Sequence, residues 1–455
     1  MSELHPLDGG FMELEDTDRH ISLGIGAAAI VAGPAPTRAE FVEWLQSRLD
    51  HVDRLRERVR SSRWDLTAPV WEADPHFDLA HHVRWIALPE PNDESALREV
   101  IAAELAQRLD RDHPLWQCVV VEHLAGDRWA LIVKAHHAMV DGISGISLFE
   151  RLCEPTEDRS VPEVQPSSPV PGRGRFSFAA RIVRLPVTAP RFTITAIRSL
   201  VPVVCAAVAP SGSSSLNGPI GRQRRYVVAR SSLTDVREIG AAFSASVNDV
   251  ALAAVTSAYR TLLLRRGEDP GITRLRILVP ISVRPGTAGD ALDNRVSAII
   301  PHLPVEVSDP VERLDAVHAR VTYHRARGEA EAERSMLEVA ESLPYAVVAW
   351  AFRLAGHFPQ RSVAALATNV PGPRRRLALI GRPVLEILPC IPIAMRLRTT
   401  IAILSYQQHL VFGITGDYDT TPDIDVLAEG IECGIAELLA LAQDRGEGHP
   451  SDPVG

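Results

Sequence analysis

The chain has 455 residues, of which 46% are hydrophobic and 23% are charged, and its formal net charge is −9 at pH 7. This composition is typical of a globular protein, and the length favours two domains over a single hydrophobic core. The sequence contains no long block of Lys and Arg, which argues against nucleic-acid binding. Its first residues have neither the basic start nor the apolar run of a signal peptide, so a cytoplasmic protein is expected.

The cysteines also limit the class of protein. They are scattered, with no CxxC pair and no Cys/His cluster, at Cys118, Cys153, Cys205, Cys390 and Cys433. This pattern argues against disulfides and zinc, and it favours a reducing compartment. The sequence therefore predicts no metal site.

The first half of the chain alternates helix-like and strand-like stretches. Thr37 and Glu40 have the spacing of a capping box, and Asp127 lies where a hairpin turn is expected. The predicted elements are a turn-rich segment at 6–11, a strand at 24–31, helices over 37–52 and 97–109, a strand at 118–122 and a strand from 129. This order favours an α/β or α+β fold.

The middle of the chain differs in composition. Residues 154–175 are rich in Pro, Ser and Gly, as in a linker, whereas 176–210 are apolar with isolated arginines. The longest charge-free apolar run there, 200–210, is about half of the ~20 residues that a membrane-spanning helix needs. Such a segment can lie in the headgroup plane of a membrane with its arginines directed toward phosphates. Packing between two domains is an equally good interpretation.

The second half contains its own set of elements. Ser246 and Asp249 form a second capping box, and Gly267 marks the end of that helix. The predicted elements are a strand at 226–229, strands at 275–280 and 296–303, helices from 309 and over 336–343 and 345–354, a strand at 361–369, a hairpin of 399–406 with 409–415 and a helix over 427–442. These features predict an N-terminal domain at 1–154, a crossover at 155–224, a C-terminal domain at 225–443 and a disordered tail at 444–455.

The candidate chemistry lies at 129–149, where an apolar strand runs into an amphipathic helix. The loop between them carries His136, His137, Asp141 and Gly142. Neighbouring residues at a strand end point to opposite sides, so only one imidazole can face a cleft. A neutral histidine there can remove a proton from a hydroxyl, because its pKa lies near neutrality.

An alternative is that both histidines are satisfied polar groups in the core. The chain contains a comparison pair, His81 and His82, which has no Asp-Gly four residues further on. We interpret that pair as structural. The fixed positions of the first loop, in a strand–loop–helix setting, favour a functional role for His136 and His137.

The segment 136–142, HHAMVDG, resembles the HHxxxDG motif of the CoA-dependent acyltransferase superfamily. That superfamily includes chloramphenicol acetyltransferase-like folds and nonribosomal condensation domains. Further stretches resemble the bacterial wax ester synthase/acyl-CoA:diacylglycerol acyltransferase family: PLDGGF at 6–11, PLW at 114–116, NDVALAAV at 248–255, VPISVRP at 279–285, NRVS at 294–297 and TNVPGP at 368–373. The resemblance extends over about 4–442.

This resemblance implies two chloramphenicol acetyltransferase-like domains joined by a crossover, with the active site at their interface. It assigns His137 as general base and His136 as its support, with acyl-CoA as a substrate and no cofactor. Asp141, next to Gly142, is expected to anchor the loop or to orient the imidazole directly. A covalent acyl-enzyme is not required, because the same imidazole can protonate the departing sulfur.

The resemblance also suggests substrate-binding residues. Pro114, Leu115 and Trp116 are candidates to line the acyl tunnel, although a buried turn is the more common role for such residues. Asn248 and Asp249 match the ND motif of the family, and the capping-box position of Asp249 gives a structural role equal weight.

The acceptor is suggested by three stretches, SSLNGPI, ATNVPGPRRR and PIAMRLRTT, which resemble the triacylglycerol-synthase branch. Many wax-ester-forming members carry Gly-Leu-Asn where this chain has Arg398, Thr399 and Thr400. The sequence therefore predicts transfer of a long-chain acyl group from acyl-CoA to diacylglycerol, giving triacylglycerol. Wax ester synthesis from long-chain alcohols is the alternative activity.

Two interpretations from other classes remain. A condensation enzyme would take its acyl group from a carrier protein, and this chain has no attached carrier domain. A non-enzymatic lipid-droplet coat is favoured by the apolar crossover and opposed by the intact histidine motif. The expected partners are acyl-CoA, diacylglycerol and the inner face of the membrane or a lipid droplet. The sequence does not specify an oligomeric state.

Overall fold

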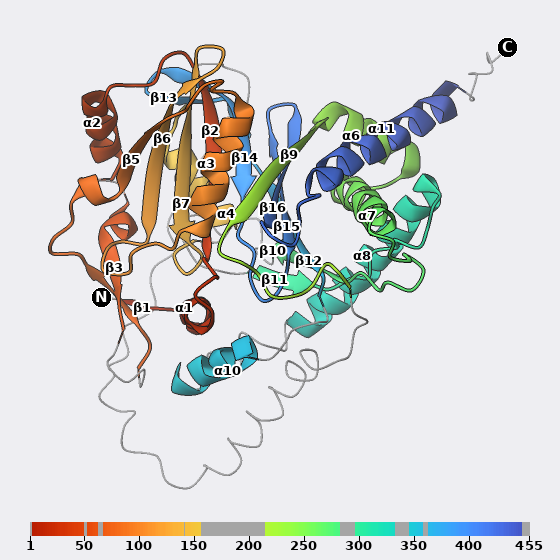
Figure 1. The fold of residues 1–455 in the computed structure, drawn as a ribbon, viewed down its shortest axis with the longest axis horizontal. Coiled ribbons are helices and arrows are strands. Elements are labelled where there is room, and N and C mark those ends of the chain that lie inside the picture. Colours follow the sequence, from red (N-terminus) through yellow and green to blue (C-terminus); the bar gives the residue numbers. More distant parts are fainter. Residues whose placement is uncertain are drawn as a thin grey trace, which may run out of the picture.

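The computed structural model describes residues 2–49, 52–61, 67–140, 142–155, 214–282, 296–332, 345–357 and 363–447. Two large mixed sheets stand side by side (Figure 1). The first runs β5 (Val83–Ala87), β6 (Trp116–Leu124), β7 (Arg128–His136), β2 (Gly24–Ala32), β14 (Arg382–Cys390), β13 (Leu377–Leu379) and β8 (Glu154–Pro155). The second runs β11 (Val296–Ile299), β10 (Ile277–Ser282), β12 (Ala365–Pro371), β15 (Thr399–Tyr406), β16 (His409–Asp417) and β9 (Arg224–Ser232).

Helices pack around these sheets, and a small third sheet consists of β1 (Ser2–Glu3), β4 (Val70–Ala73) and β3 (Glu57–Arg60). The helices of the first half are α1 (Pro6–Thr17), α2 (Arg38–Leu49), α3 (Glu94–Ala106) and α4 (Gly142–Leu152). Those of the second half are α6 (Leu233–Phe243), α7 (Val247–Arg265), α8 (Pro310–Ala332), α10 (Tyr345–His357) and α11 (Asp425–Glu447). Short 3₁₀ turns cover Asp53–Arg56 and Leu79–His81.

Local signals predicted several boundaries correctly. The Glu40 carboxylate accepts a hydrogen bond from the Thr37 backbone at 2.8 Å, which caps α2 as expected. Ser246 and Asp249 form the predicted reciprocal capping box at the start of α7. Asp127 adopts a left-handed conformation (φ 52°) in the turn that joins β6 to β7. These signals depend on contacts between residues close in the sequence, so they can be recognised without the structure.

The predicted domain boundaries do not describe the sheets. Strands β13 and β14 lie between 377 and 390, in the predicted C-terminal domain, yet they belong to the first sheet. In Figure 1 the light-blue β14 stands beside the red β2, with which it pairs antiparallel from Val384 to Cys390. Strand β2 is central, with β7 on its other edge, and a buried strand needs hydrogen-bond partners on both edges. The two halves of the chain are therefore interlocked.

Two further predictions were wrong. The segment 6–11 is not a turn but the start of α1, with Pro6 at its first position, which is favourable for a helix. The first residues of the predicted tail, 444–447, are helical, since α11 continues to Glu447. Arg445 in that last turn lies over the ring of Phe243, 5.4 Å from its centroid. The predicted helix at 336–343, the apolar segment 176–210 and the tail 448–455 fall outside the described residues.

The tandem glycines of α1 allow a close helix contact. A Cβ atom on Gly9 would lie 2.5 Å from the Tyr345 ring, and one on Gly10 would lie 2.4 Å from the Phe352 ring. Both rings belong to α10, which lies against α1 below the first sheet in Figure 1. The Glu13 carboxylate adds an ion pair with Arg353 at 2.5 Å. The glycines therefore allow α1 and α10 to pack closely. Glycine is common both in turns and at such close contacts, so the sequence alone favoured a turn.

The two large sheets share part of one core. Tyr226 and Val228 of β9 pack with Ala28 of β2 and Leu388 of β14. The buried Tyr226 hydroxyl donates a hydrogen bond to the Pro389 carbonyl at 2.9 Å. Burial raises the pKa of this phenol far above its usual value, so the hydroxyl keeps its proton.

Within the described ranges, no single helix is long and apolar enough to cross a membrane. Helices α6 and α7 meet that criterion only as a pair, and they are bent by 100° at the break between them.

Candidate active site

The predicted loop lies at the end of β7, where the strand leaves the first sheet. The His136 backbone N–H donates to the Leu115 carbonyl at 2.9 Å, and its own carbonyl accepts from the Met139 N–H at 2.8 Å. Helix α4 then begins at Gly142, so the strand–loop–helix setting expected from the sequence is present. Asp141 itself lies outside the described residues, and its predicted role stays a prediction.

His136 points into the protein, and only 1% of its surface is exposed. Its Nδ1 accepts a hydrogen bond from the Ala138 backbone N–H at 3.0 Å. Because that nitrogen uses its lone pair, the ring proton resides on Nε2. Nε2 lies 3.5 Å from Oε2 of Glu15, a carboxylate of α1. A hydrogen bond at Nδ1 thus sets the orientation of the ring, and Nε2 faces a carboxylate at a distance longer than a usual hydrogen bond.

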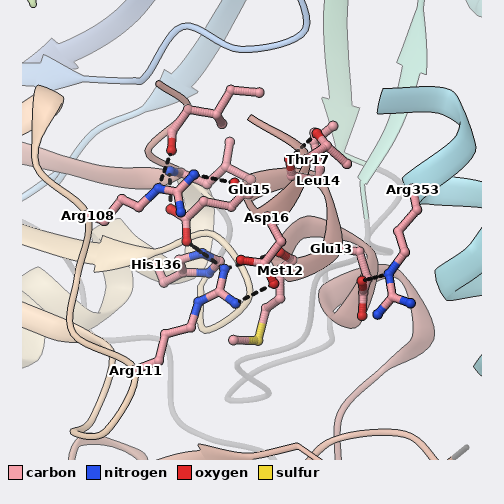
Figure 2. Close-up of polar contacts among 12 residues, drawn as sticks. Met12, Glu13, Leu14, Glu15, Asp16, Thr17, Arg108, Arg111, His136 and Arg353 are labelled. Carbon is pink, nitrogen blue, oxygen red and sulfur yellow. Dashed lines mark hydrogen bonds and ion pairs between the residues drawn. The ribbon is translucent and has the colours of Figure 1, made fainter. Parts of the chain in front are cut away.

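Glu15 is as buried as His136, with 1% of its surface exposed. It accepts hydrogen bonds from the Leu23 backbone N–H at 2.9 Å and from Arg111 at 2.8 Å (Figure 2). Burial by itself would raise the pKa of this carboxyl, but the contacts with His136, Leu23 and Arg111 outweigh it and lower the pKa to about 2. Glu15 is therefore ionised at neutral pH.

His137 has a different environment. Its backbone N–H donates to the Leu23 carbonyl at 2.9 Å, and its side chain is only partly buried. The imidazole stacks on the ring of Phe11, with centroids 4.3 Å apart and an angle of 27° between the planes. One histidine is thus enclosed and the other remains partly accessible, as the alternation of strand residues predicted.

The PLW segment forms a buried turn beneath the loop. Pro114 is buried, the Leu115 side chain is fully buried, and the Leu115 carbonyl holds the His136 backbone. The Trp116 indole donates to the Leu55 carbonyl at 2.8 Å and stacks on His82. His82 is itself buried, and burial is the main cause that lowers its pKa. The structural interpretation of the His81–His82 pair is consistent with this packing.

Asn248 and Asp249 lie at the start of α7. The Asp249 carboxylate caps the helix through Ser246 and contacts Nδ1 of His318 at 2.9 Å. Burial would raise the pKa of this carboxyl, but the contacts with His318 and Ser246 lower it. Asn248 accepts a hydrogen bond from Asn369 of β12 at 3.2 Å. These contacts tie α7 to α8 and β12, and the substrate-binding role suggested for the two residues stays a prediction.

Two family models match the chain. Residues 4–251 match the wax ester synthase/diacylglycerol acyltransferase catalytic domain, and 292–439 match the C-terminal domain of the same family. A probable diacylglycerol O-acyltransferase of Mycobacterium tuberculosis, tgs1, is 43% identical over 98% of this chain and 97% of its own length. The O-acyltransferase WSD of Acinetobacter baylyi is 27% identical over 95% and 96%.

The chain belongs to the wax ester synthase/diacylglycerol acyltransferase family. It is therefore an acyltransferase, and the non-enzymatic droplet-coat interpretation is not supported.

Solved structures confirm the fold of this family. The wax ester synthase/diacylglycerol acyltransferase from Marinobacter aquaeolei VT8 superposes with a TM-score of 0.70 at 25% identity, over 97% of this chain and all of that one. A condensation domain of the calcium-dependent antibiotic synthetase superposes with a TM-score of 0.60 at 16% identity, over 96% of each chain. The predicted two-domain, chloramphenicol acetyltransferase-like architecture is confirmed.

Four residues around the histidines of this family member were not predicted as site residues. They are Phe11, Glu15, Leu23 and Arg111. The missed signal was the helix at 6–17: residues four apart lie on the same helix face, so Phe11 and Glu15 would have been paired. Leu23 and Arg111 act through a backbone carbonyl and a long-range ion pair, for which the sequence holds no local signal.

Proposed function

We propose that this protein transfers a long-chain acyl group from acyl-CoA to the free hydroxyl of diacylglycerol, with His137 as general base. The observation that carries the proposal is the contrast between the two histidines. His136 is enclosed and held by Ala138 and Glu15, whereas His137 is partly exposed and stacked on Phe11. The second imidazole is the more exposed of the two and is the better candidate to meet a substrate hydroxyl.

The proposed reaction follows from that placement. The His137 imidazole removes the proton of the acceptor hydroxyl as the oxygen attacks the thioester carbonyl. The tetrahedral intermediate then expels the CoA sulfur, which receives the proton back from the imidazolium. The products are an ester and CoA, and the histidine returns to its neutral form. The step needs no covalent enzyme intermediate and no cofactor.

The choice of acceptor is supported by the surroundings of Phe11. Two of the three stretches that resemble the triacylglycerol-synthase branch, 214–220 and 392–400, are joined by an antiparallel bridge between Asn217 and Leu397. Ile220 and Ile393, one from each stretch, pack together with Leu14 and Leu23 beside Phe11. The branch-specific residues are therefore neighbours of the aromatic ring that holds His137, where the apolar part of an acceptor would lie.

The acceptor prediction is tested by a direct competition of substrates. With palmitoyl-CoA as donor, diacylglycerol is expected to be esterified several-fold faster than hexadecanol at a matched interfacial concentration. Radiolabelled products separated by thin-layer chromatography give both rates in one reaction. A clear preference for hexadecanol would make the protein a wax ester synthase, the activity named in its family description.

We also propose that the enzyme works at the cytoplasmic face of the membrane or on lipid droplets, because diacylglycerol stays in lipid. The segment expected to lie in the headgroup plane, 176–210, is outside the described residues. A triple variant in which Phe178, Ile182 and Ile197 are each replaced by serine is expected to be released from anionic vesicles in a flotation assay, because the substitutions remove apolar anchoring area. A folded triple variant that still floats would place the contact elsewhere.

A further inference from the structure

The Glu15 carboxylate contacts the His136 ring and also Leu23, the residue that holds the His137 backbone. Oε1 of Glu15 accepts the Leu23 backbone N–H at 2.9 Å, and the Leu23 carbonyl accepts the His137 backbone N–H at 2.9 Å. Oε2 of the same carboxylate lies 3.5 Å from Nε2 of His136. Glu15 is therefore connected to the backbone of one histidine and to the side chain of the other. Glu15 lies one helical turn after Phe11, so the residue that contacts His136 and the residue that stacks on His137 are on the same face of α1.

The charge of this carboxylate is balanced locally. Arg111 donates to Glu15 at 2.8 Å and to the neighbouring Asp16 at 2.8 Å (Figure 2). Burial would lower the pKa of Arg111, but these two carboxylates outweigh it and raise the pKa. Both members of the Glu15–Arg111 pair are thus ionised at neutral pH. The arginine is 31% exposed, but the carboxylate is buried, so loss of this partner would leave an uncompensated buried charge.

We infer that Glu15 is a positioning residue for acyl transfer, which fixes the proton of His136 on Nε2 and holds the loop that presents His137. The inference rests on the proposed role of His137 as base. Glu15 does not touch the substrate or the reacting atoms. Its effect is exerted through His136 on one side and through Leu23 on the other.

The glutamine variant isolates this role, because it keeps the shape and removes the charge. If the amide oxygen of Glu15→Gln accepts from Leu23, its NH₂ group must face Arg111 and the Nε2–H of His136. The amide NH₂ and the Nε2–H of His136 then face other donors and have no acceptor there, whereas Arg111 keeps its bonds to Met12 and Asp16. His136 can move its proton to Nδ1 only by losing the hydrogen bond from Ala138. In the other orientation the amide oxygen faces Arg111 and His136, and the NH₂ group meets the Leu23 N–H, so the support of the His137 backbone is lost instead. The variant therefore breaks one of the two contacts of Glu15 whichever way the amide turns.

The kinetic test compares this variant with a neighbour that shares the same arginine. Glu15→Gln is expected to lower kcat roughly tenfold to a hundredfold, the cost of losing a partner that orients a histidine. The KM for acyl-CoA is expected to change less than about twofold, because Glu15 does not contact the substrate and its loss does not weaken substrate binding in the ground state. Asp16→Asn is the matched control: it pairs with Arg111 but is 54% exposed. It should retain wild-type kcat.

A spectroscopic arm separates positioning from a loss of folding. In protein labelled with ¹⁵N-histidine, the Nε2–H resonance of His136 is assigned by its disappearance in His136→Gln. It is expected to persist in Asp16→Asn and to disappear or shift in Glu15→Gln. Should Glu15→Gln fail to fold, Glu15→Asp serves instead, because it keeps the charge and withdraws it from His136 by one methylene. It should give the same changes with a smaller loss of kcat.

The outcomes discriminate between the two proposals. A folded Glu15→Gln with wild-type kcat, or with a lowered kcat and an unchanged His136 resonance, overturns the positioning role. A shifted resonance together with an active His137→Ala supports the control of His136 by Glu15 and rejects the proposed base instead.

Discussion

Replacement of His137 by alanine is expected to lower kcat/KM at least about a hundredfold, the lower end of what a general base contributes. The imidazole is the partly exposed member of the pair, stacked on Phe11 at 4.3 Å, so its loss removes the group that would take the acceptor proton. His136→Ala should cost less, because that side chain supports the loop from within the protein. Initial rates with palmitoyl-CoA and diacylglycerol, for variants shown to be folded by circular dichroism, give the comparison.

The second His-His pair of the chain supplies a matched control. His81 lies in the 3₁₀ turn Leu79–His81 and stacks on His113 at 4.4 Å, and His81→Ala should retain the wild-type rate. If a folded His136→Ala is inactive while His137→Ala keeps most of its turnover, the roles of the two histidines are reversed.

Replacement of Gly413 by alanine is expected to destabilise the protein by about 3 kcal/mol, the upper part of the usual range for overpacking. Gly413 lies in β16, where the second sheet meets the first. A Cβ atom there would lie 1.9 Å from the Pro389 carbonyl oxygen and 2.6 Å from the Tyr226 hydroxyl oxygen. The obstacle on one side is backbone, which cannot turn away, and the hydrogen bond between Tyr226 and Pro389 would also be strained.

The change is measured as the denaturant midpoint of unfolding, followed by tryptophan fluorescence. Gly145→Ala in α4 is the control, because a Cβ atom there would meet only Val140, at 3.9 Å. Alanine favours helix over glycine by about 1 kcal/mol, so this control should be unchanged or slightly more stable. Equal midpoints for Gly413→Ala and wild type would mean that the sheets separate at little cost, contrary to the close contact at Pro389.

The sequence by itself determined the parts that depend on near neighbours. Alternation along β7 placed His136 and His137 on opposite sides, and the structure shows one enclosed and one accessible. The capping boxes at Thr37 and Ser246 marked their helices, because a cap is a contact between residues three apart. The family resemblance, which rests on short motifs along most of the chain, predicted the two-domain architecture.

Only the tertiary structure decided the rest. Pairing of β14 with β2 joins distant segments, and no local pattern specifies which strand fills a free sheet edge. The glycines at 9 and 10 led us to predict a turn. The reason for glycine there is close packing against α10, which lies in the other half of the chain and leaves no local signal. Glu15 and Arg111 surround the histidine loop for the same reason: burial of a charge is satisfied by whichever partner the fold brings near, and spacing in the sequence does not record that partner.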